Sequence, residues 1–356
     1  MFQRARTWLL RSGIQEPGGG VARYYRADVE NNLPVSTEIT GYFTGALFHL
    51  HELASAATTE AGLAAAHYLT RQAWSAQHAT IPFEPGSEYA YFFDIGIIVR
   101  GLLAAWKATG EQEFADRAKD AALSLAFDFL GDGVFHPVIT LPEKQPLDYE
   151  PKRWSRSPGC YQLKSALAWH DIGQAFGDAH ATRVFEAALA SALATHESFL
   201  PGVDDPEKVM DRLHAYGYFL EALLSVGDRP ECRKALTEGI ERVGRYLREI
   251  SPRFERSDVC AQLLRVRVIA HRHCGLPLDH EAAAEEARRA AAYQASSADP
   301  RIEGGFWFGK KRDGSPEHQK MLPFVNPVST VFCLQALALW QDHCEDRWTF
   351  QLHELV

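Results

Sequence analysis

The sequence lacks the features that mark several large classes of protein. Its six cysteines form no C-x-x-C pair, so neither a zinc ribbon nor a redox motif is indicated. No apolar run reaches the roughly 20 residues of a membrane-spanning helix, and the first dozen residues carry charges without the apolar stretch of a signal peptide. Acidic residues outnumber basic ones by 46 to 37, which argues against a nucleic-acid binder. We therefore expect a cytoplasmic protein without a membrane or nucleic-acid partner.

What the sequence does have is a helical pattern that continues from end to end. Of its 356 residues, 46% are apolar, enough to bury a large core. Apolar residues recur at helical spacing, and strand-like alternation is confined to short pieces. Glycines at the ends of several segments are typical of helix stops. We expect twelve helices, at about 3–12, 36–54, 58–74, 91–109, 111–130, 159–176, 178–198, 211–226, 230–250, 257–274, 279–295 and 327–344.

The helices alternate between two kinds. One kind has a single apolar stripe and a wet face, which is typical of an outer helix, and the other is apolar nearly all round, which is typical of a buried one. Six buried helices shielded by six outer ones predict an all-α, single-domain (α/α)6 toroid over residues 1–356, with short β-hairpins in the 75–90 and 301–313 loops. An open solenoid is the alternative, but its terminal repeat would need a polar cap. The last buried helix is too apolar for that role.

Long connections precede the buried helices, and short ones follow them. Long loops in a compact domain are commonly functional, so we expect them to wall a funnel-shaped cavity floored by the first turns of the buried helices. The polar residues of these first turns are the candidate site residues: Glu38, Asp94, Tyr161 with Lys164, His214, Asp258 and Asn326.

Three of these residues are acids that can serve acid/base chemistry. Glu38, Asp94 and Asp258 each stand at the start of a buried helix. Asp in this position is often only a helix cap, but Ser36 already offers a cap beside Glu38. Acids gathered in one cavity shift one another's pKa and provide the pair that glycosidic chemistry needs. His214 is a candidate base, with a structural histidine as the alternative. The sequence leaves inverting and retaining mechanisms open.

Aromatic and polar residues supply the expected sugar contacts. Aromatic faces pack on the apolar faces of sugar rings, although ordinary core packing is the alternative for each ring. Lys164 interrupts a buried helix, so we expect it to pair with a carboxylate. The candidate substrate-binding residues are Tyr42, Trp154, Tyr161, Lys164, Tyr216, Trp307 and Asn326.

One pair of residues resembles a known zinc site. Asp258-Val259-Cys260 is similar to the Asp-x-Cys pair of protein prenyltransferase β-subunits, which are also (α/α)6 toroids. The third ligand of that family is a His in the following inner helix, and here the nearest candidate is His318 in the loop. Two ligands do not hold zinc against solvent. We expect neither a metal nor a cofactor.

The whole pattern resembles the six-hairpin glycosidase superfamily. In addition, EGGFWFGKKRDGSPEHQKMLPF at 303–324 is similar to the stretch before the last inner helix of N-acylglucosamine 2-epimerase and cellobiose 2-epimerase relatives. That family uses histidines as acid and base, a role that His214 or His318 would fill here. Its final Arg-His pair is replaced by Asn326-Pro327. The resemblance implies a carbohydrate-active enzyme that takes a small saccharide or oligosaccharide and is most similar to a hydrolase. The alternatives are a sugar 2-epimerase (an isomerase) using His214 and a non-catalytic toroid that binds a glycan or a protein.

Overall fold

A computed structural model describes residues 1–200, 205–312 and 319–356 of the chain. That part of the chain contains twelve α-helices, as the sequence predicted. None of the described helices is long and apolar enough to cross a membrane. Their bounds are α1 Phe2–Arg11, α2 Thr37–His49, α3 Ala56–Tyr68, α4 Phe92–Thr109, α5 Gln112–Asp128, α6 Gln162–Phe176, α7 Ala179–Thr195, α8 Pro206–Leu223, α9 Pro230–Ile250, α10 Ser257–Cys274, α11 His280–Ala291 and α12 Pro327–Cys344.

The contacts between residues divide the chain into two compact units. The first unit comprises Gln15–Arg23 and Pro34–Thr195, and the second comprises Met1–Ile14, Tyr24–Leu33 and His196–Val356. The first unit therefore holds α2 to α7, and the second holds α1 and α8 to α12. That the chain is one domain stays a prediction.

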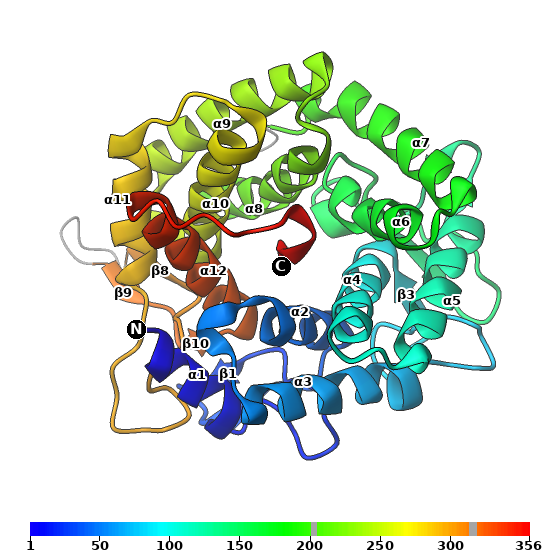
Figure 1. Ribbon diagram of the computed structural model, residues 1–356, viewed down its shortest axis with the longest axis horizontal. Helices are drawn as coiled ribbons and strands as arrows, with labels where there is room; N and C mark the ends of the chain where they lie inside the picture. Colours follow the sequence, from blue (N-terminus) through cyan, green and yellow to red (C-terminus); the bar gives the residue numbers. More distant parts are fainter. Residues whose placement is uncertain (201–204, 313–318) are drawn as a thin grey trace. The chain divides into compact units, whose positions relative to one another are not determined.

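In the first unit, three buried helices alternate with three outer ones. The buried α4 packs on both α2 and α6, and each of these three helices also packs on the outer helix that follows it: α3, α5 or α7 (Figure 1). Two glycines bring α2 and α4 together. A Cβ built on Gly101 of α4 would lie 2.5 Å from the carbonyl oxygen of Gly41 of α2. This contact joins the second turn of α2 to the third turn of α4 and holds the two helices side by side.

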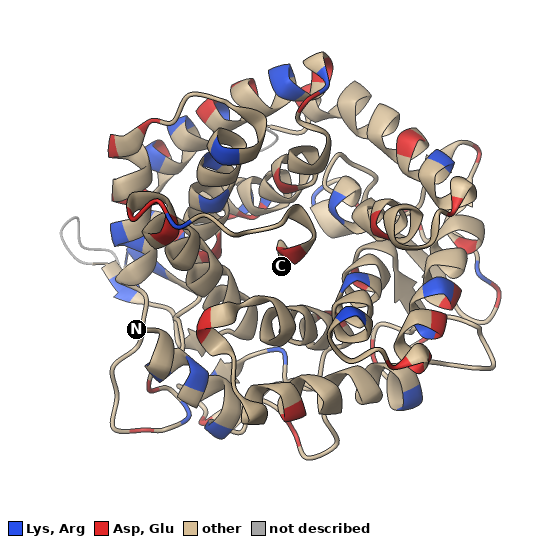
Figure 2. Cartoon of the chain, in the orientation of Figure 1, with Lys and Arg blue, Asp and Glu red and all other residues tan. Residues whose placement is uncertain are grey.

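The second unit repeats this arrangement with α8, α10 and α12 buried. The outer helices α9 and α11 carry charged residues along their length, whereas α12 carries one charge, near its C-terminal end (Figure 2). A fully buried ion pair joins α8 to α10, with Arg265 Nη2 2.5 Å from Glu221 Oε1. The same guanidinium donates to Gln335 Oε1 of α12 at 3.1 Å. Because a buried charge needs a partner, this contact ties the three buried helices to one another.

Short strands stand directly before three of the buried helices. β3 (Tyr89–Tyr91) precedes α4 and pairs with β6 (Val138–Thr140). β7 (Phe254–Arg256) precedes α10 and pairs with β8 (Gly309–Arg312), which in turn pairs with β9 (Gln319–Met321). β10 (Phe324–Val325) precedes α12 and pairs with β1 (Tyr25–Arg26), which also pairs with β2 (Asn31–Asn32). The remaining strands, β4 (Leu130–Gly131) and β5 (Val134–Phe135), pair with each other.

The expected hairpins differ in detail from the observed strands. In the 75–90 loop the only bridge between two residues of the described loop itself joins Ser75 to Thr80, because its last strand, β3, pairs with the distant β6 instead. The 301–313 segment contributes β8, whose partners lie on either side of it in the sequence. The pairs β3–β6 and β7–β8 join segments that are distant in the sequence. Such pairing leaves no local turn signal, so the sequence did not show it.

The start of α8 also differs from the prediction. The sequence placed it at about residue 211, but α8 begins at Pro206, and Asp205 caps it by accepting the backbone N–H of Glu207. Asp205 followed by Pro206 at the first helical position is a typical signal for a helix start. The prediction missed it because the first turn of α8 is polar and therefore lacks the apolar helical pattern. His214 is therefore the ninth residue of α8 and lies in its third turn.

The approach of α2 and α4 predicts a sharp difference between two glycines. Gly101→Ala forces a methyl group against the Gly41 carbonyl and should lower the free energy of unfolding by about 1–3 kcal/mol. Gly45→Ala is the matched control on the same face, because a Cβ there would lie 4.0 Å from the nearest atom, Gly101 Cα. It should be neutral or stabilise by up to about 1 kcal/mol. Urea unfolding followed by circular dichroism measures both, and equal effects would contradict the packing described.

Candidate functional site

The first unit brings together two of the predicted acids. Glu38 is the second residue of α2, where Ser36 accepts the backbone N–H of Ile39 and so caps the helix. Asp94 is the third residue of α4, which has no side-chain cap hydrogen bond. Because a separate residue caps α2, capping does not account for Glu38. We call Glu38 and Asp94 the acid pair.

The surroundings of the acid pair disfavour two negative charges. Burial raises the pKa of Glu38 to about 7, and burial together with the charge of Glu38 raises the pKa of Asp94 well above its usual value. Asp94 is only 7% exposed, and its Oδ2 has no hydrogen-bond partner among the described residues. Like charges that lie close together share a proton. Burial and mutual repulsion therefore both favour the protonated forms of the pair.

A nearby cation, which the sequence pattern did not reveal, opposes the rise in the two pKa values. The positive charge of Arg23 lowers the pKa of both Glu38 and Asp94. Its guanidinium donates to Glu84 Oε1 at 2.8 Å and lies 4.8 Å from the ring centroid of Phe83. Arg23 stands in a loop outside any helical pattern, so only its position in space distinguishes it from the other arginines.

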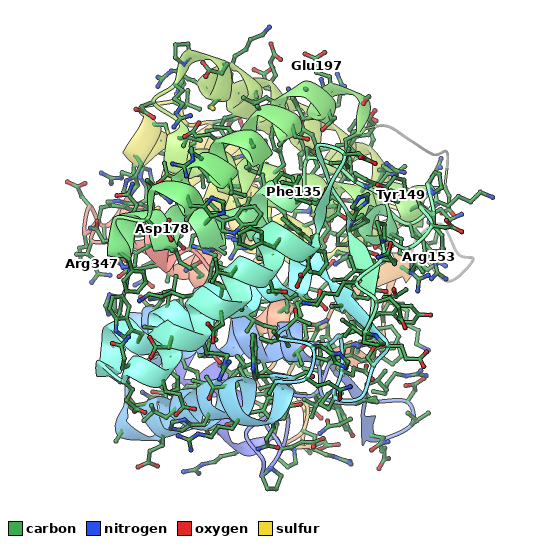
Figure 3. All side chains as sticks on the ribbon, turned by 90° about the vertical axis from the view of Figure 1, so that its right-hand side faces the viewer. Phe135, Tyr149, Arg153, Asp178, Glu197 and Arg347 are labelled. Atoms are coloured by element: carbon green, nitrogen blue, oxygen red, sulfur yellow. The ribbon has the colours of Figure 1, made fainter. Side chains whose placement is uncertain are left out.

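Aromatic rings gather beside the acid pair. Trp154 lies 4.9 Å from Tyr161 and 6.1 Å from Phe93, measured between ring centroids, and both contacts are edge-to-face. Burial raises the pKa of Tyr161, and the charge of Asp94 adds to the rise, which places this ring near the acid. Trp154 belongs to the same long loop as Tyr149 and Arg153 (Figure 3). Trp154 and Tyr161, both predicted to bind the substrate, thus lie next to each other.

Two further predicted residues of this unit are buried inside it. Tyr42 of α2 is 3% exposed, and Lys164 of α6 is fully buried. Both therefore lie inside the packed helices, and their predicted contact with a substrate stays a prediction.

The second unit contains a histidine cluster, which we define as His214, Asp258, Gln262 and Arg256. Asp258, the second residue of α10, is 2% exposed and receives two hydrogen bonds from Arg256, at 3.0 and 2.6 Å. Arg256 also donates to Asp211 at 2.6 Å. The Arg256 charge holds the pKa of Asp258 below its usual value. Asp258 is consequently an ionised, paired carboxylate.

The same contacts determine the charge of the His214 ring and the nitrogen that carries its hydrogen. Burial and the charge of Arg256 lower the pKa of His214 to about 4, so the imidazole is neutral at neutral pH. Its Nδ1 lies 2.7 Å from Gln262 Oε1 and 3.7 Å from Asp258 Oδ2. With two oxygens facing Nδ1, the hydrogen of the neutral ring belongs on Nδ1. Nε2 then carries a lone pair and can accept a proton or a hydroxyl hydrogen.

Other predicted residues are engaged elsewhere in the second unit. Tyr216 is fully buried, and its hydroxyl lies 3.1 Å from His196 Nδ1. Asn326 caps α12 by accepting the backbone N–H groups of Val328 and Ser329. Trp307 is half-buried and receives the Ser257 hydroxyl on its carbonyl oxygen. These contacts are structural, and sugar binding by the three side chains stays a prediction.

The Asp-x-Cys pair does not form a metal centre with the described residues. Asp258 is occupied by Arg256, and Cys260 is fully buried. Among residues 1–200, 205–312 and 319–356, no group of three or more His, Cys, Asp and Glu side chains could hold an ion. His318 lies outside the described residues. That the protein binds no metal stays a prediction.

Known proteins resemble this chain in structure and not in sequence. No family model matches the sequence, and no curated protein matches it. A sugar epimerase from a ruminal bacterium matches with a TM-score of 0.69 and 12% identity, covering 95% of this chain and 98% of that one. A cellobiose 2-epimerase from Spirochaeta thermophila matches with a TM-score of 0.69 and 14% identity, covering 94% and 92%. A glycoside hydrolase family 76 mannosidase from Bacteroides thetaiotaomicron matches with a TM-score of 0.57 and 11% identity, covering 96% and 99%.

The fold is an (α/α)6 toroid. The match over nearly the full length of each toroid protein confirms the fold class and the six-hairpin resemblance that the sequence indicated. These structural neighbours are carbohydrate-active enzymes and include both epimerases and glycoside hydrolases. At 11–14% identity the likeness shows the fold alone, and function depends on the site.

The histidine cluster makes a spectroscopic prediction. The ring of His214 should stay neutral, with its hydrogen on Nδ1, from about pH 5.5 to 8, because its pKa is lowered to about 4. Gln262→Leu removes the nearer acceptor and should populate the Nε2–H form. Nitrogen-15 shifts of the histidine rings measure both states. A His214 that titrates near the ordinary pKa of about 6.5, or that carries its hydrogen on Nε2 in the unaltered protein, would contradict the assignment.

Proposed function

We propose that the protein is a carbohydrate-active enzyme in which Glu38 and Asp94 perform acid/base chemistry on a glycosidic bond. The observation that carries this proposal is the acid pair, two carboxyl groups in the first turns of adjacent buried helices whose pKa values burial raises. The proposal is also supported by the structural likeness to glycoside hydrolases and sugar epimerases. The substrate is a saccharide, for which Trp154 and Tyr161 offer aromatic contacts.

The chemistry follows from the shared proton. The protonated carboxyl donates to the glycosidic oxygen as the bond to the anomeric carbon breaks, and the ionised carboxyl assists water or the anomeric carbon on the other side. Water supplies the new hydroxyl on one sugar and the proton that restores the acid. Arg23 keeps one member of the pair ionised, because its charge favours the carboxylate. Asp258 is ionised and paired with Arg256, so it has no proton to donate. It serves better as a group that orients His214.

A sugar 2-epimerase is the second candidate, and the state of His214 favours it. A neutral imidazole with a lone pair on Nε2 can remove the proton from a carbon next to a carbonyl and return it to the other face. The structural likeness to a sugar epimerase and to a cellobiose 2-epimerase supports this alternative. A glycan-binding protein without catalytic activity is the third candidate function.

Amide substitutions test the acid pair. Glu38→Gln and Asp94→Asn should each lower the rate of saccharide hydrolysis by about 10²–10⁴-fold, because proton transfer contributes about that much. Asp258→Asn is the matched control, since it also alters a buried acid in a first helical turn. It should cost far less activity if the acid pair does the chemistry. Release of reducing ends from a panel of oligosaccharides gives the rates, and circular dichroism confirms folding.

Other outcomes of the same experiment identify the alternatives. If the acid-pair variants keep full activity while His214→Ala is inactive, and deuterium from solvent enters the sugar next to its carbonyl, the protein is an epimerase. If saccharides bind but no product forms with any variant or with the unaltered protein, the protein binds glycans only.

Arg23 gives a pH-dependent prediction. Its positive charge lowers the pKa of both acids, so Arg23→Met should raise the pKa of both and move both limbs of the pH–rate profile to higher pH. Arg23→Lys should retain much of the original profile, because the positive charge remains. The pH dependence of kcat/KM measures the shift. A profile that stays in place in Arg23→Met, or moves to lower pH, would contradict the electrostatic role.

A further inference from the structure

Two hollows in the surface of the first unit meet at one tryptophan. The larger has a volume of about 530 Å³ and is bordered by the segment after α3 and by the 85–88 and 141–142 turns. The smaller, of about 380 Å³, is bordered by the outer helix α5. Trp74 lines both hollows, so they adjoin at this side chain, and we call the two together the Trp74 groove. The face of the molecule that carries α5 is turned toward the viewer in Figure 3.

The tryptophan is held in place and remains accessible. Trp74 is half-buried, and the Arg117 guanidinium lies 4.1 Å from its ring centroid. Such a cation over an aromatic face fixes the ring. In the smaller hollow Phe127 is 68% exposed, although the His180 ring stacks on one of its faces at 5.6 Å, and Leu123 is 47% exposed. The groove thus offers apolar faces at two places along its length.

The larger hollow has a mixed lining, in which polar side chains stand beside prolines, Trp74 and Leu141. Its polar members are Gln72, Ser75, Gln77, His78, Ser87 and Glu88. Amides and hydroxyls both donate and accept hydrogen bonds, as the hydroxyls of a sugar require. The charged groups lining the two hollows are Glu88, Asp120 and Asp128 against Lys144. This excess of acids disfavours phosphate, sulfate and nucleic acid.

The walls of the groove are rigid. Ser124 donates to Thr80 Oγ1 at 2.7 Å, and Lys144 donates to Asp128 Oδ2 at 2.7 Å, so α5 is tied to both bordering loops. Pro82, Pro85 and Pro142 line the larger hollow, and proline restricts the backbone. A binding surface that is already ordered loses less entropy when a ligand binds.

The groove adjoins the acid pair through one short segment. Phe83 and Glu84 contact Arg23, the cation beside the acid pair, whereas the flanking Pro82 and Pro85 border the larger hollow. A chain bound along the groove would therefore lie against the segment that holds Arg23. Both hollows fall within the usual size of ligand sites, about 300–1,000 Å³.

We infer that the Trp74 groove is a second saccharide site, which binds the neutral chain of an oligosaccharide or polysaccharide. This inference rests on the proposed function and deepens it, because it makes the substrate a glycan chain and not a single sugar. Trp74 and Phe127 stack on sugar rings, and the amides and hydroxyls between them bind the ring hydroxyls. A protein partner would favour a continuous apolar surface, and the polar side chains of the larger hollow interrupt its apolar lining.

Affinity electrophoresis in gels that contain neutral polysaccharides tests the inference. The probes are mannan, xylan, β-glucan and soluble starch, and the full chain is used throughout. At least one polysaccharide should retard the unaltered protein. Trp74→Ala should weaken that binding by about fivefold or more, and Phe127→Ala should weaken it measurably, since a stacked ring contributes roughly 1 kcal/mol. Phe127 is 68% exposed, so its variant should fold even if the Trp74 variant does not.

The controls separate the groove from the acid pair. Tyr149→Ala removes an aromatic residue of the same unit that is 45% exposed and outside the groove, and should leave retardation unchanged. Glu38→Gln should also remain retarded, although it loses hydrolysis. The inference is wrong if no polysaccharide retards the protein, if folded Trp74→Ala and Phe127→Ala are retarded normally, or if only Glu38→Gln loses retardation. Binding that depends on Trp74 in a protein whose acid-pair variants stay active would overturn the proposed chemistry and keep the groove.

Discussion

The close approach of α2 and α4 is the constraint on which the candidate site depends. Gly101 has no side chain, and a Cβ there would meet the Gly41 carbonyl. With both glycines in place, the helices lie near enough for the charge of Glu38 to raise the pKa of Asp94. A wider separation would remove this contribution and leave that of burial. The packing of two backbones thus adds to the pKa shift of a side chain in the first turn of α4.

The two candidate sites show opposite solutions to burying a titratable group. The acid pair lies in surroundings with few compensating charges, so burial raises the pKa of both members. In the histidine cluster, Arg256 neutralises Asp258 and lowers the pKa of His214. One site therefore offers a proton to give, and the other offers a lone pair to receive one. The same fold class includes both hydrolases and epimerases, which agrees with a scaffold that accommodates either type of group.

Much of the fold could be predicted from the sequence because its helices are long and strongly patterned. The bounds of α9 and α10 match the predicted residues, since Pro230 marks the start of α9 and Gly275 marks the end of α10. The start of α8 was missed because its first turn is polar. Glu38 and Asp94 could be predicted from their places in buried helices. The roles of Arg23 and Gln262 could not be predicted, because they come from contacts between residues that are distant in the sequence. Arg23 contacts Glu84, and Gln262 contacts His214.

The strands that stand before α4, α10 and α12 have a consequence for how such a scaffold can change. Each strand ends where its helix begins, and each is anchored by a partner from a distant part of the same unit. The helix start is therefore fixed by the strand pairing and not by the length of the loop that leads to it. Insertions and deletions in these loops can alter the rim of the site while the first-turn side chains keep their places. For the proposed enzyme, exchange of these loops would thus be a route to new substrate ranges that leaves the side chains of the helix starts undisturbed.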